Sequence, residues 1–254
     1  ALNKMLARIE EAFGKQRASE ERLRQFVADA SHELRTPITS IRGWAELFRR
    51  GASEHPDDLA KAMSRIEAEA DRMGFLVEDL LLLARLDQGK PLARERVDLT
   101  ALVTRAVDDA RAADPTRRID LRPEPAVVEG DEPRLKQVLD NLLANVRVHT
   151  PPGTAATVTL KADGEAIVDV ADEGPGVPNE IADRIFERFV RADASRGRDK
   201  GGAGLGLAIA SEIVRSHRGR LELVPDARGT TFRMTLPLTS ARTSDAASHI
   251  HSEA

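Results

Sequence analysis

Residues 59–84 read LAKAMSRIEAEADRMGFLVEDLLLLA, and their pattern decides the first half of the fold. Apolar and small residues recur along this stretch at alternating intervals of four and three, at Leu59, Met63, Ile66, Ala70, Met73, Val77, Leu80 and Ala84. Such a repeat is typical of a helix that packs one apolar seam against partner helices. We therefore predict a long helix here, with partners along one face.

A weaker seam precedes this stretch and predicts a second helix from Leu2 to about Phe48. Its positions are Leu2, Met5, Ile9, Ala12, Gln16, Ser19, Leu23, Phe26, Ala30, Leu34, Ile38, Ile41, Ala45 and Phe48. The steps across 30–38 contain one residue too many and include Pro37, so we expect local unwinding and a bend there. Gly, Ser, Pro and Asp over 51–58 predict the turn between the helices. Two copies of this helical hairpin can enclose both seams as a four-helix bundle, so we predict a homodimer.

Beyond residue 90 the pattern mixes helices with strands. Residues 89–97 are predicted to be a hinge, and residues 239–254, rich in Ser and Ala, a disordered tail. Helices are predicted over 99–113, 132–148 and 205–217, and strands over 119–121, 127–128, 157–160, 166–171, 221–224 and 230–236. Paired strands with intervening helices favour an α+β chain whose second domain is an α/β sandwich, with helices on one face of a mixed sheet.

The composition excludes several classes of protein. The 254 residues are 41% hydrophobic and 31% charged, with a net charge of −4, so nothing favours sequence-independent binding to nucleic acid. Aromatic residues make up only 3%, which argues against base-stacking surfaces, and the absence of Cys excludes disulfides and thiolate metal sites. The most apolar run, Leu80–Ala84, is far shorter than a membrane helix. We expect a cytoplasmic fragment whose natural start lies upstream.

The segment Phe26–Ile38 holds the first candidate site. If Ala30 and Leu34 face the bundle interior, His32 lies about 200° from either and faces solvent. A neutral imidazole is a usable nucleophile, with Glu33 beside it to accept a proton. On geometry alone, however, a surface His next to a Glu is more often ordinary helix decoration.

Two further segments offer ligands for a nucleotide. Asn141 and Asn145 are one helical turn apart and form a reasonable half-site for Mg²⁺, although helix capping explains such a pair equally well. The run Asp172-Glu-Gly-Pro-Gly176 follows a predicted strand, where a carboxylate can accept a base amino group and glycines allow close approach. A plain turn is the alternative for this run.

The run Gly201-Gly-Ala-Gly-Leu-Gly-Leu207 leads into a predicted helix. Exposed backbone N–H groups at a helix start can bind phosphate oxygens. The run is not a Walker loop, because Lys200 precedes the glycines, and it does not have the spacing of a dinucleotide fingerprint.

Together these segments resemble the bacterial sensor histidine kinases of two-component systems along nearly the whole chain. The resemblance rests on Ser31-His-Glu-Leu-Arg-Thr-Pro37, followed in order by the Asn pair, the Asp-x-Gly-x-Gly run and the glycines at 202–206. It implies the end of a HAMP signalling helix over 1–18, a dimerisation and histidine phosphotransfer domain over 19–88, and an ATP-binding catalytic domain over 98–238.

The resemblance also implies roles for individual residues. His32 takes the γ-phosphoryl group of ATP and passes it to an Asp in the receiver domain of a response regulator. Glu33 assists as acid/base, and Thr36 positions water when the same protein dephosphorylates its regulator. The residues that bind ATP and Mg²⁺, with Asn145 as the metal ligand and Arg191 in a mobile lid, are Asn141, Asn145, His149, Asp172, Gly174, Gly176, Arg191, Gly202, Gly204, Leu205 and Gly206.

The sequence differs from the family pattern at one position, and two alternative functions remain open. The family often has a basic residue three places after the second Asn, where this chain has Val148 with Arg147 before it, so a contact of Arg147 with phosphate is undecided. In one alternative function the chain acts mainly as a phosphatase on its response regulator. In the other it is a non-enzymatic dimeric scaffold. We expect it at the cytoplasmic face of the bacterial inner membrane, held there only by upstream segments. His55, His217, His249 and His251 are predicted to face solvent.

Overall fold

The computed structural model describes residues 2–49, 56–88, 92–191, 203–225 and 229–239. It divides into two compact units, residues 1–90 with 178–212 and residues 91–177 with 213–254. The hairpin and the sheet domain therefore belong to different units, and the boundary falls within one helix, α6 (Gly206–Ser216).

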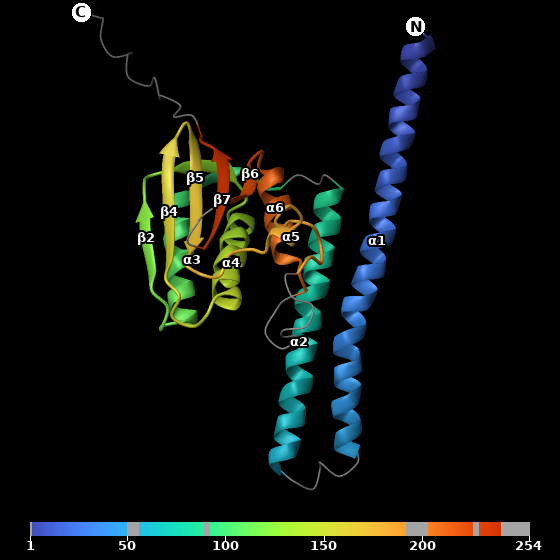
Figure 1. Ribbon diagram of the computed structural model, residues 1–254, viewed down its shortest axis with the longest axis vertical. Coiled ribbons are helices and arrows are strands. Elements are labelled where there is room, and N and C mark those ends of the chain that lie inside the picture. The colour runs from blue at the N-terminus through green and yellow to red at the C-terminus, as the bar shows by residue number, and fades with distance from the viewer. Residues whose placement is uncertain (1, 50–55, 89–91, 192–202, 226–228, 240–254) are drawn as a thin grey trace, which may run out of the picture. The chain divides into compact units, whose positions relative to one another are not determined.

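The first unit contains the predicted helical hairpin. Helix α1 (Leu2–Arg49) and helix α2 (Pro56–Asp87) lie side by side (Figure 1). Helix α2 begins with Pro56 at its first position and two Asp in its first turn, a start that suits the helix dipole. Helix α1 continues through Pro37, so the irregular spacing over 30–38 does not end it.

The hairpin buries only part of its apolar seam. The buried residues of α2 include Ala62, Leu76 and Leu83, each one place before a seam position, while most seam residues of α2 are only half-buried. By contrast, the seam residues Ile38 and Val77 remain 44% and 42% exposed. Two helices of one chain therefore leave a strip of apolar surface open along the hairpin.

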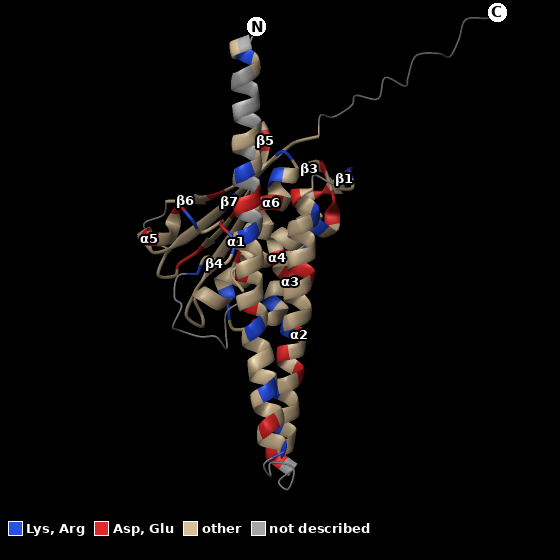
Figure 2. Cartoon of the chain, turned by 90° about the vertical axis from the view of Figure 1, so that its right-hand side faces the viewer, with Lys and Arg blue, Asp and Glu red and all other residues tan. Residues whose placement is uncertain are grey.

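Charged residues of both signs are spread along the hairpin. Figure 2 shows Lys and Arg interspersed with Asp and Glu along α1 and α2. Among the described residues, no helix is both long and apolar enough to cross a membrane.

One carboxyl of the hairpin predicts a measurable pH dependence. Burial, together with the smaller effect of the neighbouring Glu78 carboxylate, raises the pKa of Asp79 to about 6. In the unfolded chain the Asp pKa is about 3.9, so the folded chain binds more protons between these values and the unfolding free energy rises as pH falls. We expect Asp79→Asn to raise the Tm at pH 7 and to flatten its dependence on pH, measured by circular dichroism. Glu78→Gln removes only the smaller cause and is the control, whereas a lower Tm for Asp79→Asn at pH 7 would contradict the assignment.

The second unit contains a five-stranded mixed sheet. Its strand order is β2 (Ile119–Pro123), β4 (Ala156–Asp163), β5 (Glu165–Asp172), β7 (Thr230–Pro237) and β6 (Arg220–Val224). Strand β2 pairs with β4 in parallel, and the remaining neighbours are antiparallel. Helices α3 (Leu99–Ala113) and α4 (Glu132–His149) lie beside each other against this sheet (Figure 1). The α+β architecture with a mixed sheet is confirmed.

Local sequence explains where the two helices begin and which residues they bury. Asp98 and Asp131 are the N-caps, and their carboxylates accept hydrogen bonds from the backbone N–H groups of Ala101 and Arg134 at 3.0 and 3.1 Å. In β5 every second residue is buried, from Ala166 to Asp172. This alternation packs the apolar side chains of the sheet into one core and makes Asp172 the last member of that buried face.

Two predictions need correction. Within the segment predicted as a hinge, residues 95–97 belong to a strand, β1 (Glu95–Asp98), which pairs antiparallel with β3 (Val127–Gly130). The prediction that His217 faces solvent is wrong, because its Nε2 accepts a hydrogen bond from the Asp131 backbone N–H at 2.9 Å and its Nδ1 lies 2.8 Å from the Ile213 carbonyl. The ring is half-buried and joins α6 to the start of α4. His55, His249 and His251, like the tail from residue 240, lie outside the described residues.

Candidate active site

His32 lies on the exposed surface of α1. Its neighbours Ala30 and Leu34 are half-buried, which fits the predicted inward face of the helix. Within the described residues, the imidazole makes no hydrogen bond or ion pair to the protein. Both ring nitrogens are therefore available to a ligand or substrate from solvent.

Hydroxyl side chains surround His32 on the same helix. Thr36 Oγ1 donates to the His32 carbonyl at 3.4 Å, which places the Thr36 side chain one turn from the imidazole. Ser31 and Thr39 donate in the same way to the carbonyls four residues before them, at 2.7 and 2.9 Å. The Thr36 bond is the longest of the three, so this hydroxyl is the least committed to its own helix.

In the second unit, Asn141, Asn145 and His149 follow one edge of α4 at intervals of four residues. Asn141 and Asn145 are half-buried and His149 is exposed. The neighbouring face of the helix, with Leu135, Val138, Leu139, Leu142 and Val146, packs into the core and fixes the direction of this edge.

The side-chain nitrogen of Asn145 is buried and has no hydrogen-bond partner among the described residues. An amide can be turned to present its oxygen instead, because the two ends have nearly the same shape. A hard oxygen ligand is what Mg²⁺ prefers, and this metal is usually held by few protein groups together with substrate phosphates and water. Asn145 therefore fits a magnesium ion bound jointly with a nucleotide. No cluster of three or more His, Cys, Asp or Glu suited to a metal occurs in the described part of the chain.

Asp172 ends strand β5 and is 6% exposed. Its Oδ1 accepts a hydrogen bond from the Gly174 backbone N–H at 2.8 Å. Burial raises the pKa of Asp172, while hydrogen bonds from Gly174 and Thr230 and the charge of Arg117 oppose that rise. The result is a buried carboxylate at a strand end with acceptor capacity beyond its bond to Gly174.

The loop after Asp172 has no room for side chains. A Cβ atom at Gly174 would lie 2.6 Å from Asp172 Oδ1 and 2.6 Å from Thr150 Cγ2. Gly229 also lies against this loop, because a Cβ there would clash with the Asp172 carbonyl oxygen. Gly176 adopts a φ of 78° two residues further on. Thr150 and Gly229 were not predicted as site residues, because only the folded sheet brings them to this loop.

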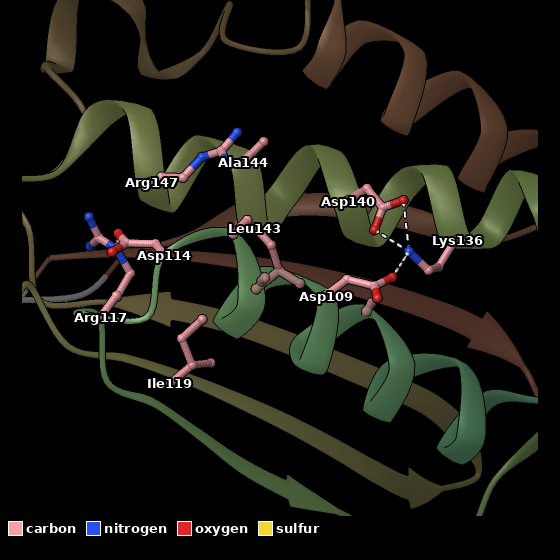
Figure 3. Close-up of a pocket in the computed structure, with 12 residues that line it drawn as sticks. Asp109, Asp114, Arg117, Ile119, Lys136, Asp140, Leu143, Ala144 and Arg147 are labelled. Carbon is pink, nitrogen blue, oxygen red and sulfur yellow. Dashed lines mark hydrogen bonds and ion pairs between the residues drawn. The ribbon is translucent and has the colours of Figure 1, made fainter.

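Arg147 does not share the edge of the two Asn residues. It lies about 200° around the helix from Asn145 and, with Asp140 and Ala144, lines a pocket between α3 and α4 (Figure 3). The position of Arg147 thus gives no support to a contact between this side chain and a nucleotide bound along that edge.

The remaining predicted residues belong to the first unit. Gly204 has a φ of 74°, and a Cβ there would lie 2.9 Å from the Val190 carbonyl oxygen, so glycine is required. Leu205 is buried, Gly206 begins α6, and Arg191 is half-buried. Gly202 lies outside the described residues.

The segment before Arg191 contacts both hairpin helices. The Arg188 guanidinium binds both carboxylate oxygens of Asp87, at 2.7 and 2.8 Å, and lies 5.1 Å from the centre of the Phe26 ring. Phe189 packs on the same ring at 6.4 Å and has a φ of 63°, which is strained for an aromatic residue. The contacts of Arg188 with Asp87 and Phe26 were not predicted from the sequence.

Two known families match separate parts of the chain. Residues 22–89 match the His Kinase A (phospho-acceptor) domain, and residues 130–240 match the histidine kinase-, DNA gyrase B- and HSP90-like ATPase. The probable sensor histidine kinase TcrY of Mycobacterium tuberculosis is 50% identical over 241 residues, which are 94% of this chain and 50% of that protein. The chain thus spans about half the length of this relative.

Solved structures agree with this assignment. The mycobacterial sensor histidine kinase MprB matches with a TM-score of 0.52 and 31% identity, over 57% of this chain and 98% of that one. The histidine kinase AdeS of Acinetobacter baumannii matches with a TM-score of 0.63 over 82% of this chain and 98% of that one, and its 23% identity supports the fold alone. With both domain matches in the same order as the two site regions, the chain belongs to the sensor histidine kinase family.

Proposed function

We propose that this chain phosphorylates itself on His32 with ATP and then passes the phosphoryl group to an Asp in the receiver domain of a response regulator. The observation that carries the proposal is the exposed imidazole of His32, free of protein hydrogen bonds among the described residues, in the part of the chain that matches the phospho-acceptor domain. Because ATP is the donor, the proposal includes a cytoplasmic location, at the inner membrane through segments outside this sequence.

The chemical step needs a free ring nitrogen and a proton acceptor. One imidazole nitrogen of His32 attacks the γ-phosphorus, a P–N bond forms, and the bond to the β-phosphate oxygen breaks to release ADP. The proton on the other ring nitrogen passes to Glu33, the adjacent carboxylate. Transfer of a phosphoryl group depends mainly on positioning and charge neutralisation, so the acceptor itself needs little activation.

Residues of the ATPase-like domain would bind the nucleotide. The buried carboxylate of Asp172 accepts the adenine amino group, and Gly174 and Gly176 belong to the loop that would lie against the base. Asn145, supported by Asn141, would hold the magnesium ion, which when bound neutralises charge on the phosphates. Gly204, Leu205 and Gly206, at or just before the start of α6, are assigned to the phosphates together with Gly202. Arg191 would be a further cation, and His149 would lie beside the base.

Incubation with ATP labelled at the γ-phosphorus tests this function. We expect label to enter the chain as an adduct that alkali preserves and acid destroys, as a P–N bond requires. ATP labelled at the α-phosphorus should leave no label and is the control. If the chain binds ATP with Mg²⁺ saturably but takes up no label, it is a nucleotide-binding protein and not a kinase, which would contradict the proposal.

A homodimer is part of the same proposal. The seam residues Ile38, Met63 and Val77 are 44%, 39% and 42% exposed in one chain, and a second hairpin would cover them. We expect residues 1–90 to sediment at twice the mass of one chain. A monomer at micromolar concentration would contradict this arrangement.

Thr36 supports phosphatase activity as a second function. Its hydroxyl is exposed one turn from His32 and holds only a long bond to its own helix, so it can orient a water molecule instead. We expect Thr36→Ala to slow dephosphorylation of the phosphorylated receiver domain about 10-fold or more while self-labelling stays within about twofold. Thr39→Ala, two turns from His32 with a similar backbone bond, is the matched control and should change neither rate. Equal loss in both variants would point to helix damage rather than to water positioning.

A further inference from the structure

Arg117 is a buried cation that the proposed reaction does not use. Its side chain is 3% exposed, in the loop between α3 and β2. Its Nε pairs with Asp114 at 3.0 Å, and its two terminal nitrogens donate to Thr150 Oγ1 at 2.6 Å, the Thr154 carbonyl at 3.0 Å and the Pro151 carbonyl at 3.3 Å. Burial of a guanidinium is costly unless its donors are satisfied, so this site is built around the charge.

The acceptors of the two terminal nitrogens of Arg117 all lie just after the last turn of α4. Thr150 is the C-cap of this helix, and its hydroxyl donates in turn to the Val146 carbonyl at 2.6 Å. Many helices end at a glycine in the left-handed conformation, whereas Thr150 has an extended backbone. Arg117 therefore supplies the positive charge and the hydrogen bonds that complete the C-terminal end of α4.

The same Thr150 contacts the loop after Asp172. A Cβ at Gly174 would clash with both Thr150 Cγ2 and Asp172 Oδ1, each at 2.6 Å. The charge of Arg117 also reaches Asp172, where it lowers the pKa of the carboxyl against the effect of burial. One guanidinium thus acts on the helix that carries Asn141 and Asn145 and on the loop that carries the buried carboxylate.

We propose that Arg117 is a positioning residue for nucleotide binding, because it fixes the end of α4 against the Asp172–Gly176 loop through Thr150. This inference rests on the proposed function, because that function places the nucleotide between α4 and the Asp172–Gly176 loop. Arg117 does not touch the nucleotide in this account. Its loss should therefore weaken ATP binding more than it slows phosphoryl transfer at saturating ATP.

A solvent-accessible pocket makes a chemical rescue feasible. The pocket between α3 and α4 has a volume of about 270 Å³ and is lined by Arg117, Asp114 and Arg147 (Figure 3). Truncation of Arg117 to Ala would extend this pocket towards Thr150. A free guanidinium ion is small enough to enter the space and to restore the missing donors.

The experiment compares Arg117→Ala with Arg111→Ala in the full chain. Arg111 is the matched control, since its guanidinium donates to the Ile119 carbonyl at 3.2 and 2.6 Å in the same α3–β2 region without touching residues 150–154. We expect Arg117→Ala to raise the KM for ATP about 10-fold or more, as the loss of buried charged hydrogen bonds implies, with kcat for self-labelling within about threefold. A few millimolar guanidinium should recover much of the loss in Arg117→Ala and none in Arg111→Ala.

Thr150→Val covers the case in which Arg117→Ala does not fold. It keeps the shape of Thr150 and removes the hydroxyl, so the KM for ATP should rise about 3- to 10-fold. An unchanged KM in a folded variant of either residue would overturn the inference, as would an equal rise in Arg111→Ala. Failure of the wild-type chain to bind ATP at all would instead overturn the proposed function.

Discussion

The His32→Gln variant should incorporate no γ-phosphoryl group from ATP while it still binds ATP with Mg²⁺. Glutamine is close to histidine in size and polar, so an exposed position on α1 tolerates it without loss of the helix. It has no nucleophilic nitrogen, because the amide lone pair is delocalised. We expect labelling to fall below about one thousandth of wild type, since removal of a covalent nucleophile leaves no alternative route.

A second variant distinguishes loss of the phosphoryl acceptor, His32, from loss of the proposed proton acceptor, Glu33. Glu33→Gln keeps the imidazole and removes the carboxylate next to it, so labelling should slow about 10²-fold and still reach His32. The nucleotide affinity of both variants, measured with a fluorescent ADP analogue, should stay within about twofold of wild type. Residual labelling of His32→Gln at the wild-type rate would mean that another residue is the acceptor.

The Asp172→Asn variant should lose most of its affinity for adenine nucleotides. The Gly174 N–H and Thr230 both donate hydrogen bonds to this carboxylate. In Asp172→Asn the amide NH₂ replaces one of the accepting oxygens, so two hydrogen-bond donors would point at each other. The adenine amino group would lose its charged acceptor as well. Together these effects are worth about 3 kcal/mol, so we expect a Kd about 10²-fold weaker.

The pH dependence of the same affinity offers a second measurement. Adenine binding needs the ionised carboxylate, and burial raises the pKa of Asp172. The wild-type affinity should therefore begin to fall on acidification at a pH above about 3.9, the ordinary Asp value, and Asp172→Asn should lack this step. Asp169→Asn is the control, because Asp169 lies on the opposite face of β5 and pairs with Arg233 at 2.7 Å. Equal weakening in both variants would contradict the assignment.

The regular parts of this fold could be predicted closely from sequence periodicity. The helix predicted over 99–113 has these same bounds in the structure, as α3. It begins at an Asp N-cap and has a clear apolar face, and both signals are local. Strand β1 was missed because it has only four residues, of which Val97 alone is buried, and because its partner β3 lies about thirty residues further along the chain.

The roles of His217 and Arg117 could not be predicted, because they depend on contacts distant in sequence. Asp131, whose backbone N–H donates to the His217 ring, is 86 residues from His217, and Thr150 is 33 residues from Arg117. Nothing in the residues around either side chain distinguishes it from an ordinary surface cation or imidazole. The motif residues, in contrast, could be proposed because the local order of His, Asn, Asp and Gly segments resembles a known family.

Identification of the phosphorylated residue shows whether His32 itself receives the phosphoryl group from ATP. The chain is incubated with ATP and Mg²⁺, digested at neutral to alkaline pH, and its peptides are sequenced by tandem mass spectrometry with electron-transfer fragmentation. We expect a mass increase of one phosphoryl group on His32 and on no other residue. A phosphoryl group found on a different residue, with His32 unmodified, would contradict this expectation.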